Sequence, residues 1–292
     1  MSTTVVIPAR NAAETIARQV EALSRQRGDD CFHVIVVDNG SSDGTGAVAL
    51  ANAGDRFTIE VVHESRPGIN MARNAGIARA PDGLILLCDA DDEVSDGWVR
   101  AMVSARVPQH WLAGMVDYST LNSAKTMRQW AAPARSVPPE NDLVGDRTFG
   151  CNCGFDRKMW VEIGGFDGRL SGVGGDETEM FLRALAAGYR PRWVPDGLVA
   201  YRLRPGLPNM CRQRFRQGRN QVRMRRLLGE QTGSTVPIGR DEWLALGKLA
   251  IAMPFYLGSS RRFEWLAACS RNVGRLVGIN RDAPCDGQQV LT

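Results

Sequence analysis

The stretch Leu84-Ile85-Leu86-Leu87-Cys88-Asp89-Ala90-Asp91-Asp92 decides the fold, because an apolar run ends there in three carboxylates. A run of this length is typical of a strand that is buried on both faces of a sheet. In extended backbone, Asp89 and Asp91 point to the same side. Two such carboxylates repel each other unless a positive charge lies between them, and a hard divalent cation that also binds phosphate oxygens meets that need. The alternative is that the acids simply begin the next loop or helix.

Strands and helices alternate on the N-terminal side of this stretch. The predicted strands are Thr3–Ile7, Phe32–Val37 and Thr58–His63, and the predicted helices are Asn11–Arg25, Thr45–Asn52 and Ile69–Arg79. Asn11 is the predicted cap of the first helix. This order predicts a parallel, doubly wound sheet, in which ligands bind beyond the carboxyl ends of the strands. The ends concerned are Pro8–Asn11, Asp38 and Asp89–Asp91.

The pattern weakens after the acidic stretch and then returns. From Trp98 to Arg147 we expect a sheet edge and a mobile loop that includes the turn-rich Pro133–Pro139. Beyond Phe149 the sequence predicts helices at Arg157–Ile163 and Glu177–Ala187, separated by the turn Gly164-Gly165-Phe166-Asp167 and a glycine-rich loop. After Pro205 the sequence is helical and basic, and then apolar.

Composition excludes several classes of protein. The 292 residues are 43% apolar and 23% charged, which is ordinary for a globular protein with one substantial core. Seven cysteines form no framework, and Cys151 and Cys153 lack the second ligand pair of a zinc site, so reduced thiols are expected. No apolar run reaches the length of a membrane span, and the predicted strand at Thr3 leaves no room for a leader. We therefore expect a cytoplasmic protein.

Further motifs follow one another in a fixed order. They are Val5–Asn11, Val36–Thr45, Arg66-Pro67-Gly68 with Ala72–Gly76, Asp89-Ala90-Asp91, Gly164–Asp167 and Asp176–Arg183. This set resembles the family 2 glycosyltransferases of the GT-A fold, from about Thr3 to Arg204. The resemblance implies an α/β fold with a Rossmann-like, mostly parallel sheet flanked by helices. It also implies a catalytic domain at 1–204, with a nucleotide-sugar half at about 1–100 and an acceptor half at about 101–204. A helical C-terminal segment would occupy 205–292.

The resemblance implies an inverting transfer of a sugar from a nucleotide-diphospho-sugar to a hydroxyl acceptor, which is a sugar, a lipid-linked group or another alcohol. Such hexosyl transfers serve polysaccharide or glycolipid biosynthesis. The implied nucleotide-sugar-binding residues are Pro8, Ala9, Asn11, Asp38, Arg73 and Asp89. Asp91, with Asp89, would hold Mn²⁺ or Mg²⁺, while Asn152 and Gly175 would lie on the acceptor side. Many relatives add a histidine ligand where this chain has Tyr201, and a neutral tyrosine is a poor ligand.

The catalytic base is expected from Asp176-Glu177, since inverting transfer needs a carboxylate to take the acceptor proton. Relatives usually carry Glu-Asp in this motif, whereas the order here is Asp-Glu. Counting back from Arg183 places Glu177 at the position of the base, with Asp176 as the alternative. The spacing of Asp176 and Glu179 also matches a capping box, with Asp in place of Ser or Thr.

Other functions remain open at this point. A nucleotidyltransferase would need a glycine-rich, lysine-bearing phosphate loop, which Pro8–Asn11 is not. A non-catalytic nucleotide-sugar-binding module is a further alternative. Nine arginines and one acid, Glu230, lie between 201 and 230, but few aromatics accompany them, so nucleic acid is an unlikely partner. The apolar tract from Trp243 to Leu257 predicts either peripheral binding to an anionic membrane on its inner face or packing on the catalytic domain or in a homodimer.

Overall fold

The computed structural model of the chain describes residues 2–28, 31–136, 149–170, 174–232, 240–257, 259 and 261–281. The contacts among its residues divide the chain into two compact units. The sheet unit is Met1–Met127, Ala132–Ser171 and Asp176–Leu203, and the helical unit is Arg128–Ala131, Gly172–Gly175 and Arg204–Thr292. The expected division of the catalytic part into a nucleotide-sugar half and an acceptor half stays a prediction.

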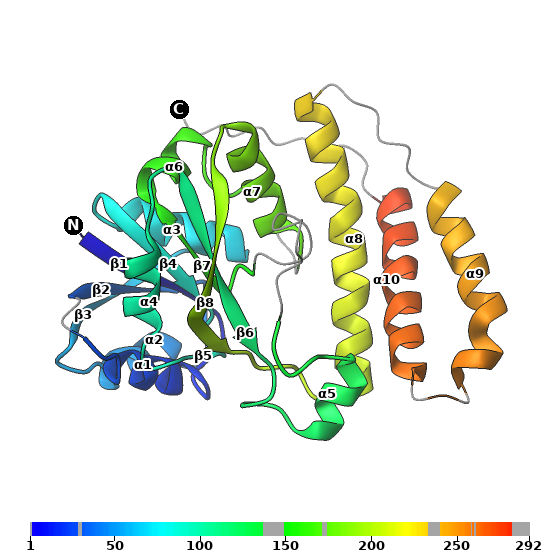
Figure 1. Ribbon diagram of the computed structural model, residues 1–292, viewed down its shortest axis with the longest axis horizontal. Coiled ribbons are helices and arrows are strands. Elements are labelled where there is room, and N and C mark those ends of the chain that lie inside the picture. The colour runs from blue at the N-terminus through cyan, green and yellow to red at the C-terminus, as the bar shows by residue number, and fades with distance from the viewer. Residues whose placement is uncertain are drawn as a thin grey trace. The chain divides into compact units, whose positions relative to one another are not determined.

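One mixed sheet forms the centre of the sheet unit (Figure 1). Its order is β3-β2-β1-β4-β7-β6-β8-β5. The strands are β1 (Ser2–Ala9), β2 (Phe32–Asp38), β3 (Phe57–His63), β4 (Gly83–Cys88), β5 (Glu93–Val94), β6 (His110–Asp117), β7 (Asn152–Asp156) and β8 (Arg190–Ala200). The first four in the order run parallel, whereas β7 is antiparallel to β4 and to β6. The predicted mostly parallel α/β sheet is therefore confirmed.

Helices cover both faces of this sheet. Alternate residues of β1 and β4 point to opposite faces and build two cores, in which Val5 and Leu86 belong to one and Val6 and Leu87 to the other. The first core includes residues of α1 (Ile16–Ser24), α2 (Thr45–Ala51) and α4 (Trp98–Ala105). The second includes residues of α3 (Ile69–Arg79), α6 (Arg157–Glu162) and α7 (Asp176–Ala186). A short helix, α5 (Ala124–Trp130), follows β6.

Two expectations about local structure were wrong. The expected sheet edge near Trp111 is instead β6, which pairs with β7 and β8 inside the sheet. Its Trp111 is buried and stacks on Phe181 with ring centroids 4.9 Å apart. The first helix begins at Ile16 and not at Asn11, because Asn11 adopts a φ of 50° and binds the loop after β2. Most of the expected mobile loop, residues 137–148, lies outside the described residues.

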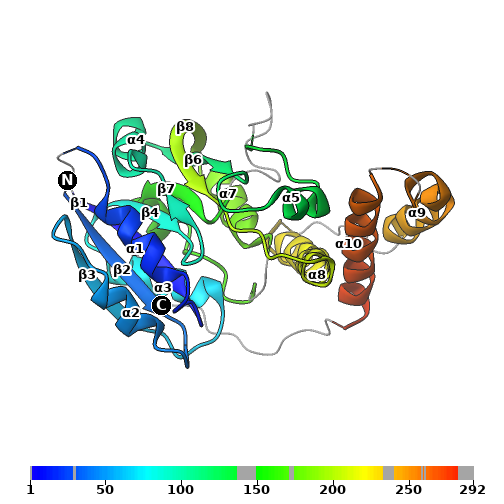
Figure 2. The same ribbon diagram turned by 90° about the horizontal axis from the view of Figure 1, so that it is seen from below.

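Three helices build most of the helical unit. They are α8 (Leu207–Thr232), α9 (Arg240–Leu257) and α10 (Arg262–Arg281), and α10 packs against both of the others (Figure 2). The α8 and α10 backbones approach closely at glycines: a Cβ at Gly218 would lie 1.9 Å from Arg271 O, and one at Gly274 would lie 2.0 Å from Phe215 O. Among the residues that the structure describes, no helix is long and apolar enough to cross a bilayer.

Candidate active site

The expected nucleotide-binding residues at the ends of β1 and β2 lie side by side. Ala9 pairs with Asp38 in parallel register, and Pro8 and Ala9 are buried. Asp38 is 8% exposed, and its Oδ1 accepts a hydrogen bond from Ser41 N at 2.8 Å. Asn11 closes this edge, because its backbone N–H donates to Ser41 Oγ at 3.0 Å and its Oδ1 accepts from Ser42 N at 2.9 Å. The two strand ends therefore form one ordered rim.

Arg73 on α3 connects the two acidic motifs. Its guanidinium is buried and lies 2.6 Å from Asp176 Oδ2 and 3.6 Å from Asp89 Oδ1. It also lies over the Phe166 ring, 5.3 Å from the centroid. Burial opposes the charge, yet the carboxylates of Asp176 and Asp89 raise the pKa of Arg73 above its ordinary value. The arginine is therefore a fixed cation between residues that lie far apart in the sequence.

The turn after β4 is held by groups from other elements. Gln19 on α1 donates to Asp89 O at 3.2 Å and accepts from Val94 N at 3.0 Å. Asp92 is 1% exposed, and its Oδ1 accepts from Arg202 N at 2.8 Å. Arg202 Nε donates to Asp91 O at 2.9 Å. These bonds fix the backbone of the acidic turn and occupy one oxygen of the Asp92 carboxylate.

Two carboxylates of this turn and the thiol of Cys151, which directly precedes β7, form a candidate cation site. Asp89, Asp92 and Cys151 each offer one ligand atom, and these atoms lie within 4.8 Å of one another. Asp89 Oδ1 and Asp92 Oδ2 are buried without a hydrogen-bond partner among the described residues. Burial, followed by the neighbouring charge of Asp91, raises the pKa of Asp92, and burial raises the pKa of Asp89 to about 6. Buried, mutually repelling oxygens fit a divalent cation.

Tyr201 lies beside this group of acids. Burial raises the pKa of its hydroxyl, and the charge of Asp92 adds to that effect. The ring packs edge-on against Tyr118, with centroids 5.6 Å apart. A neutral phenol is a poor ligand for a divalent cation, so Tyr201 adds no ligand to this candidate site.

The first turn of α7 carries the expected base. Asp176 is 3% exposed and paired with Arg73, as described above. Glu177 is half-buried, and its pKa is raised well above the ordinary value by burial and by the charge of Asp176. The two adjacent acids therefore lie in different electrostatic environments. The negative charge of Asp176 is balanced by the guanidinium of Arg73, whereas the raised pKa of Glu177 means that its carboxylate binds a proton more tightly than a free carboxylate does.

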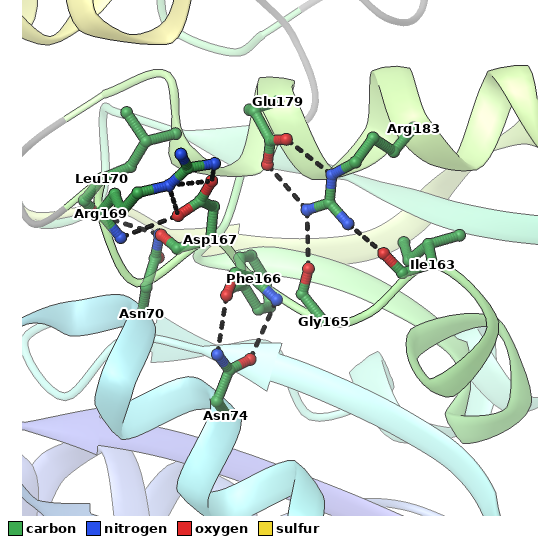
Figure 3. Close-up of polar contacts among 10 residues, drawn as sticks. All are labelled: Asn70, Asn74, Ile163, Gly165, Phe166, Asp167, Arg169, Leu170, Glu179 and Arg183. Atoms are coloured by element: carbon green, nitrogen blue, oxygen red, sulfur yellow. Dashed lines mark hydrogen bonds and ion pairs between the residues drawn. The ribbon is translucent and has the colours of Figure 1, made fainter. Parts of the chain in front are cut away.

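The loop before α7 is clamped from two sides (Figure 3). On the α3 side, Asn74 donates to Phe166 O at 2.8 Å and accepts from Phe166 N at 3.0 Å. On the α7 side, Arg183 binds Glu179 at 2.6 Å and Gly165 O at 2.6 Å, and it also contacts Ile163 O. Through this clamp the Gly-Gly-Phe-Asp turn connects α3 to α7, so it helps to set where α7 lies relative to Arg73.

The two residues expected on the acceptor side lie in different surroundings. Asn152 is fully buried, accepts from Trp98 Nε1 at 2.8 Å and donates to Met115 O and Gly197 O, both at 2.8 Å. Its amide therefore ties strands together with both N–H groups in use, and its acceptor-side role stays a prediction. Gly175 has a φ of 99° and directly precedes α7, and its acceptor-side role stays a prediction.

Comparison with known proteins identifies the family. The model named "Glycosyl transferase family 2" matches residues 4–129, and the model named "Glycosyl transferase family group 2" matches residues 84–269, more than half of the chain. The chain belongs to the family 2 glycosyltransferases. This assignment favours glycosyl transfer over the nucleotidyltransferase alternative.

Individual relatives agree with this family 2 assignment. "Glycosyltransferase AglE" of Haloferax volcanii is 24% identical over 95% of this chain and 96% of its own length. The "Pre-mycofactocin glycosyltransferase" of Mycobacterium tuberculosis is 29% identical over 68% of this chain and 42% of its own. Among solved structures, the mannosyltransferase PcManGT of Pyrobaculum calidifontis, in complex with GDP-Man and Mn²⁺, superposes with a TM-score of 0.68 at 18% identity, covering 97% of this chain and 88% of that one. The fold is that of the GT-A glycosyltransferases.

Sequence reasoning missed three contributors to this glycosyltransferase site. Asp92 belongs to the acidic stretch, but the sequence predicted only Asp89 and Asp91 as cation ligands. Cys151 was set aside because its C-x-C motif lacks a zinc partner, and no local signal places it beside Asp92. Gln19 was not predicted, although it lies three residues after Ile16 and so shares a helix face with an apolar residue, which was a usable signal. The site therefore contains more positioning groups than the motifs named.

Proposed function

We propose that this family 2 glycosyltransferase transfers a hexosyl group from a nucleotide-diphospho-sugar to a hydroxyl acceptor with inversion, aided by a divalent cation. One observation carries the proposal: the Arg73 guanidinium lies 3.6 Å from Asp89 and 2.6 Å from Asp176. This joins the acids at the end of β4 to the acids that begin α7, so the donor-side and base-side carboxylates belong to one site.

On the donor side, the rim formed by Ala9, Asn11 and Asp38 supports binding of the nucleotide. Asp38 is held by Ser41 N through one oxygen, and a base N–H is a suitable donor to a carboxylate at a strand end. Solved proteins of the same fold carry GDP-Man and UDP-GlcNAc, so nucleotide sugars of either base are reasonable donors to test.

The acids of the β4 turn would hold the cation, which is Mn²⁺ or Mg²⁺. Asp91 and Asp89 are the proposed ligands, and the buried oxygens of Asp92 and the nearby Cys151 thiol fit the same ion. When bound, the cation would act as a Lewis acid that neutralises charge on the leaving diphosphate.

On the base side, Glu177 would accept the proton of the acceptor hydroxyl. The acceptor oxygen bonds to the anomeric carbon, the bond from that carbon to the diphosphate oxygen breaks, and the electron pair leaves on the nucleoside diphosphate. A pKa raised by burial suits a carboxylate that must take up a proton near neutral pH. Asp176, already paired with Arg73, would position the start of α7 and would not accept this proton.

A donor screen tests the proposed function. The purified chain with Mn²⁺ is incubated with a panel of UDP- and GDP-sugars, and release of nucleoside diphosphate is followed with and without simple hydroxyl acceptors. We expect one base and one sugar to be used well above the rest. Tight binding of a nucleotide sugar without any release across the panel and the acceptors would favour the non-catalytic binding module instead.

A further inference from the structure

The chain's charge is divided unequally along its length. Residues 204–281 carry fifteen arginines and lysines and four acids, a net charge of +11, whereas the rest of the chain carries a net charge of −7. The overall charge of +4 conceals this asymmetry. A segment this basic attracts anionic partners over a Debye length, and nothing in the proposed chemistry requires it.

Helix α9, in the same segment, has an apolar face that its neighbours leave uncovered. Four large side chains on it are more than half exposed: Trp243 is 64% exposed, Leu244 54%, Ile251 78% and Phe255 80%. From Trp243 to Tyr256 the sequence contains one charged residue, Lys248, which is also exposed. A surface helix ordinarily presents charged residues to water, so this face is unusual for a solvated helix.

The opposite side of α9 is already occupied. Trp265 of α10 donates its Nε1–H to Leu249 O at 2.8 Å, and α9 packs against α10. The exposed residues therefore do not lie on the side of α9 that packs against α10. They form a second apolar face, which is defined here as the outer face of α9: Trp243, Leu244, Ile251 and Phe255.

We propose that the outer face of α9 docks on an anionic lipid surface and lies in the plane of the headgroups. Two of its four residues, Trp243 and Phe255, are aromatic, and the apolar face of an interfacial helix typically carries Trp, Phe and Leu. Lys248 lies among the apolar residues, and Arg261 and Arg262, both exposed, come a few residues after the end of α9, where α10 begins. Long cationic side chains can keep their apolar stems in the interface while their charges meet phosphate groups.

Other occupants fit the outer face less well. A second copy would bring two segments of +11 together, and like charges across an interface disfavour association. The longer segments outside the described residues are 137–148, 233–239 and 282–292; they read VPPENDLVGDRT, GSTVPIG and DAPCDGQQVLT and offer few apolar side chains to cover it. The proposal concerns where the enzyme is held, so it does not depend on the proposed function.

Vesicle co-sedimentation of the full chain tests this proposal. The vesicles are made either of phosphatidylcholine alone or of equal parts phosphatidylcholine and phosphatidylglycerol, each over a series of NaCl concentrations. The test variant is Ile251→Ser with Phe255→Ser. The matched control is Leu50→Ser with Val161→Ser, two residues of the sheet unit that are 49% and 56% exposed. Circular dichroism and light scattering monitor folding and oligomeric state.

We expect the wild type and the control to sediment with the phosphatidylglycerol vesicles and to dissociate as salt rises, because screening shortens the attraction. The α9 variant should bind at least tenfold more weakly while keeping its helical signal. Equal binding of the α9 variant and wild type would overturn the proposal, and so would a wild type that ignores anionic vesicles at low salt. A wild-type dimer that the α9 variant converts to monomer would assign the outer face to a second copy instead.

Discussion

The turn after β4 and the first turn of α7 both concentrate acids, but the structure compensates them differently. In the β4 turn, Asp89 Oδ1 and Asp92 Oδ2 are buried without a hydrogen-bond partner among the described residues. In α7, Asp176 is paired with Arg73 at 2.6 Å and Glu179 with Arg183 at 2.6 Å, which leaves Glu177 with a raised pKa. The first arrangement fits the proposed cation, whereas the second already contains its cations and leaves Glu177, the proposed base, without one in the part of the chain that the structure describes.

One arginine, Arg73, carries a positive charge that compensates acids in both regions. Arg73 lies at hydrogen-bond distance from the α7 acid and at 3.6 Å from the β4 acid, so its charge is shared unequally. A cation bound at the β4 turn would complete the compensation there without displacing the arginine. The predictions below test whether the two acidic regions have these separate roles.

The largest effect is expected from removing the cation or its proposed ligand. Asp91→Asn, or an excess of chelator, should reduce transfer by roughly 10³-fold or more, because the Lewis acid supplies several kcal/mol at the leaving group. Added Mn²⁺ should restore the chelated wild type but not the variant. Full turnover in excess chelator would refute the cation's role. A stronger defect in Asp92→Asn than in Asp91→Asn would assign the main ligand to Asp92.

The next effect separates the two acids of α7. Glu177→Gln should lower the turnover number by roughly 10²–10⁴-fold with little change in donor affinity, because it removes a proton acceptor. Its unfolding midpoint should stay equal or rise, since burial already disfavours the charge of Glu177. Asp176→Asn should instead destabilise the fold by about 3–5 kcal/mol, because it leaves the buried Arg73 without its nearest partner.

The opposite result for this pair is equally informative. An active Glu177→Gln with an Asp176→Asn that is inactive but stable would place the base one residue earlier. Denaturant unfolding and initial rates, measured on both variants, distinguish these outcomes.

A smaller effect tests the position of Arg73 itself. A Cβ added at Gly150 would lie 2.4 Å from Arg73 Nη2 and 2.8 Å from its Cζ. Gly150→Ala should therefore push the guanidinium away from the acids and cost about 1–3 kcal/mol of stability, together with part of the activity. Gly97→Ala, where the added Cβ meets nothing within 4 Å, is the matched control. Equal stability of both variants would show that the Arg73 guanidinium can shift away from an added Cβ at little cost, despite its burial.

The smallest effect concerns pH. The raised pKa of Asp89, about 6, means that the unfolded chain loses this proton first, so the stability of the cation-free protein should fall as pH rises toward about 6. The rise in melting temperature produced by Mn²⁺ should accordingly be larger at about pH 7.5 than at about pH 5, since protons compete for the carboxylate. Asp89→Asn should flatten this difference, and an unchanged profile in that variant would assign it to another group.

Much of the fold was predictable because its signals are local. A short apolar run that ends in acids marks the end of β4, and alternating strands and helices predict the parallel half of the sheet. The expected base region also begins α7, as its acidic first turn indicates. Beyond Trp98, β6 was missed as an inner strand, because its place depends on pairing with β7 and β8 from later in the chain.

The sequence by itself determined the family, the parallel strands and the acids at their ends, since each depends on residue type and on spacing along a few turns of chain. Only the tertiary structure decided which of these groups meet. Arg73 reaches Asp176 across 103 residues, Cys151 comes to lie beside Asp92, and the buried amide of Asn152 donates to the backbone of β6. The physical reason is that burial and pairing set the charge and availability of a side chain, and both arise from residues distant in sequence.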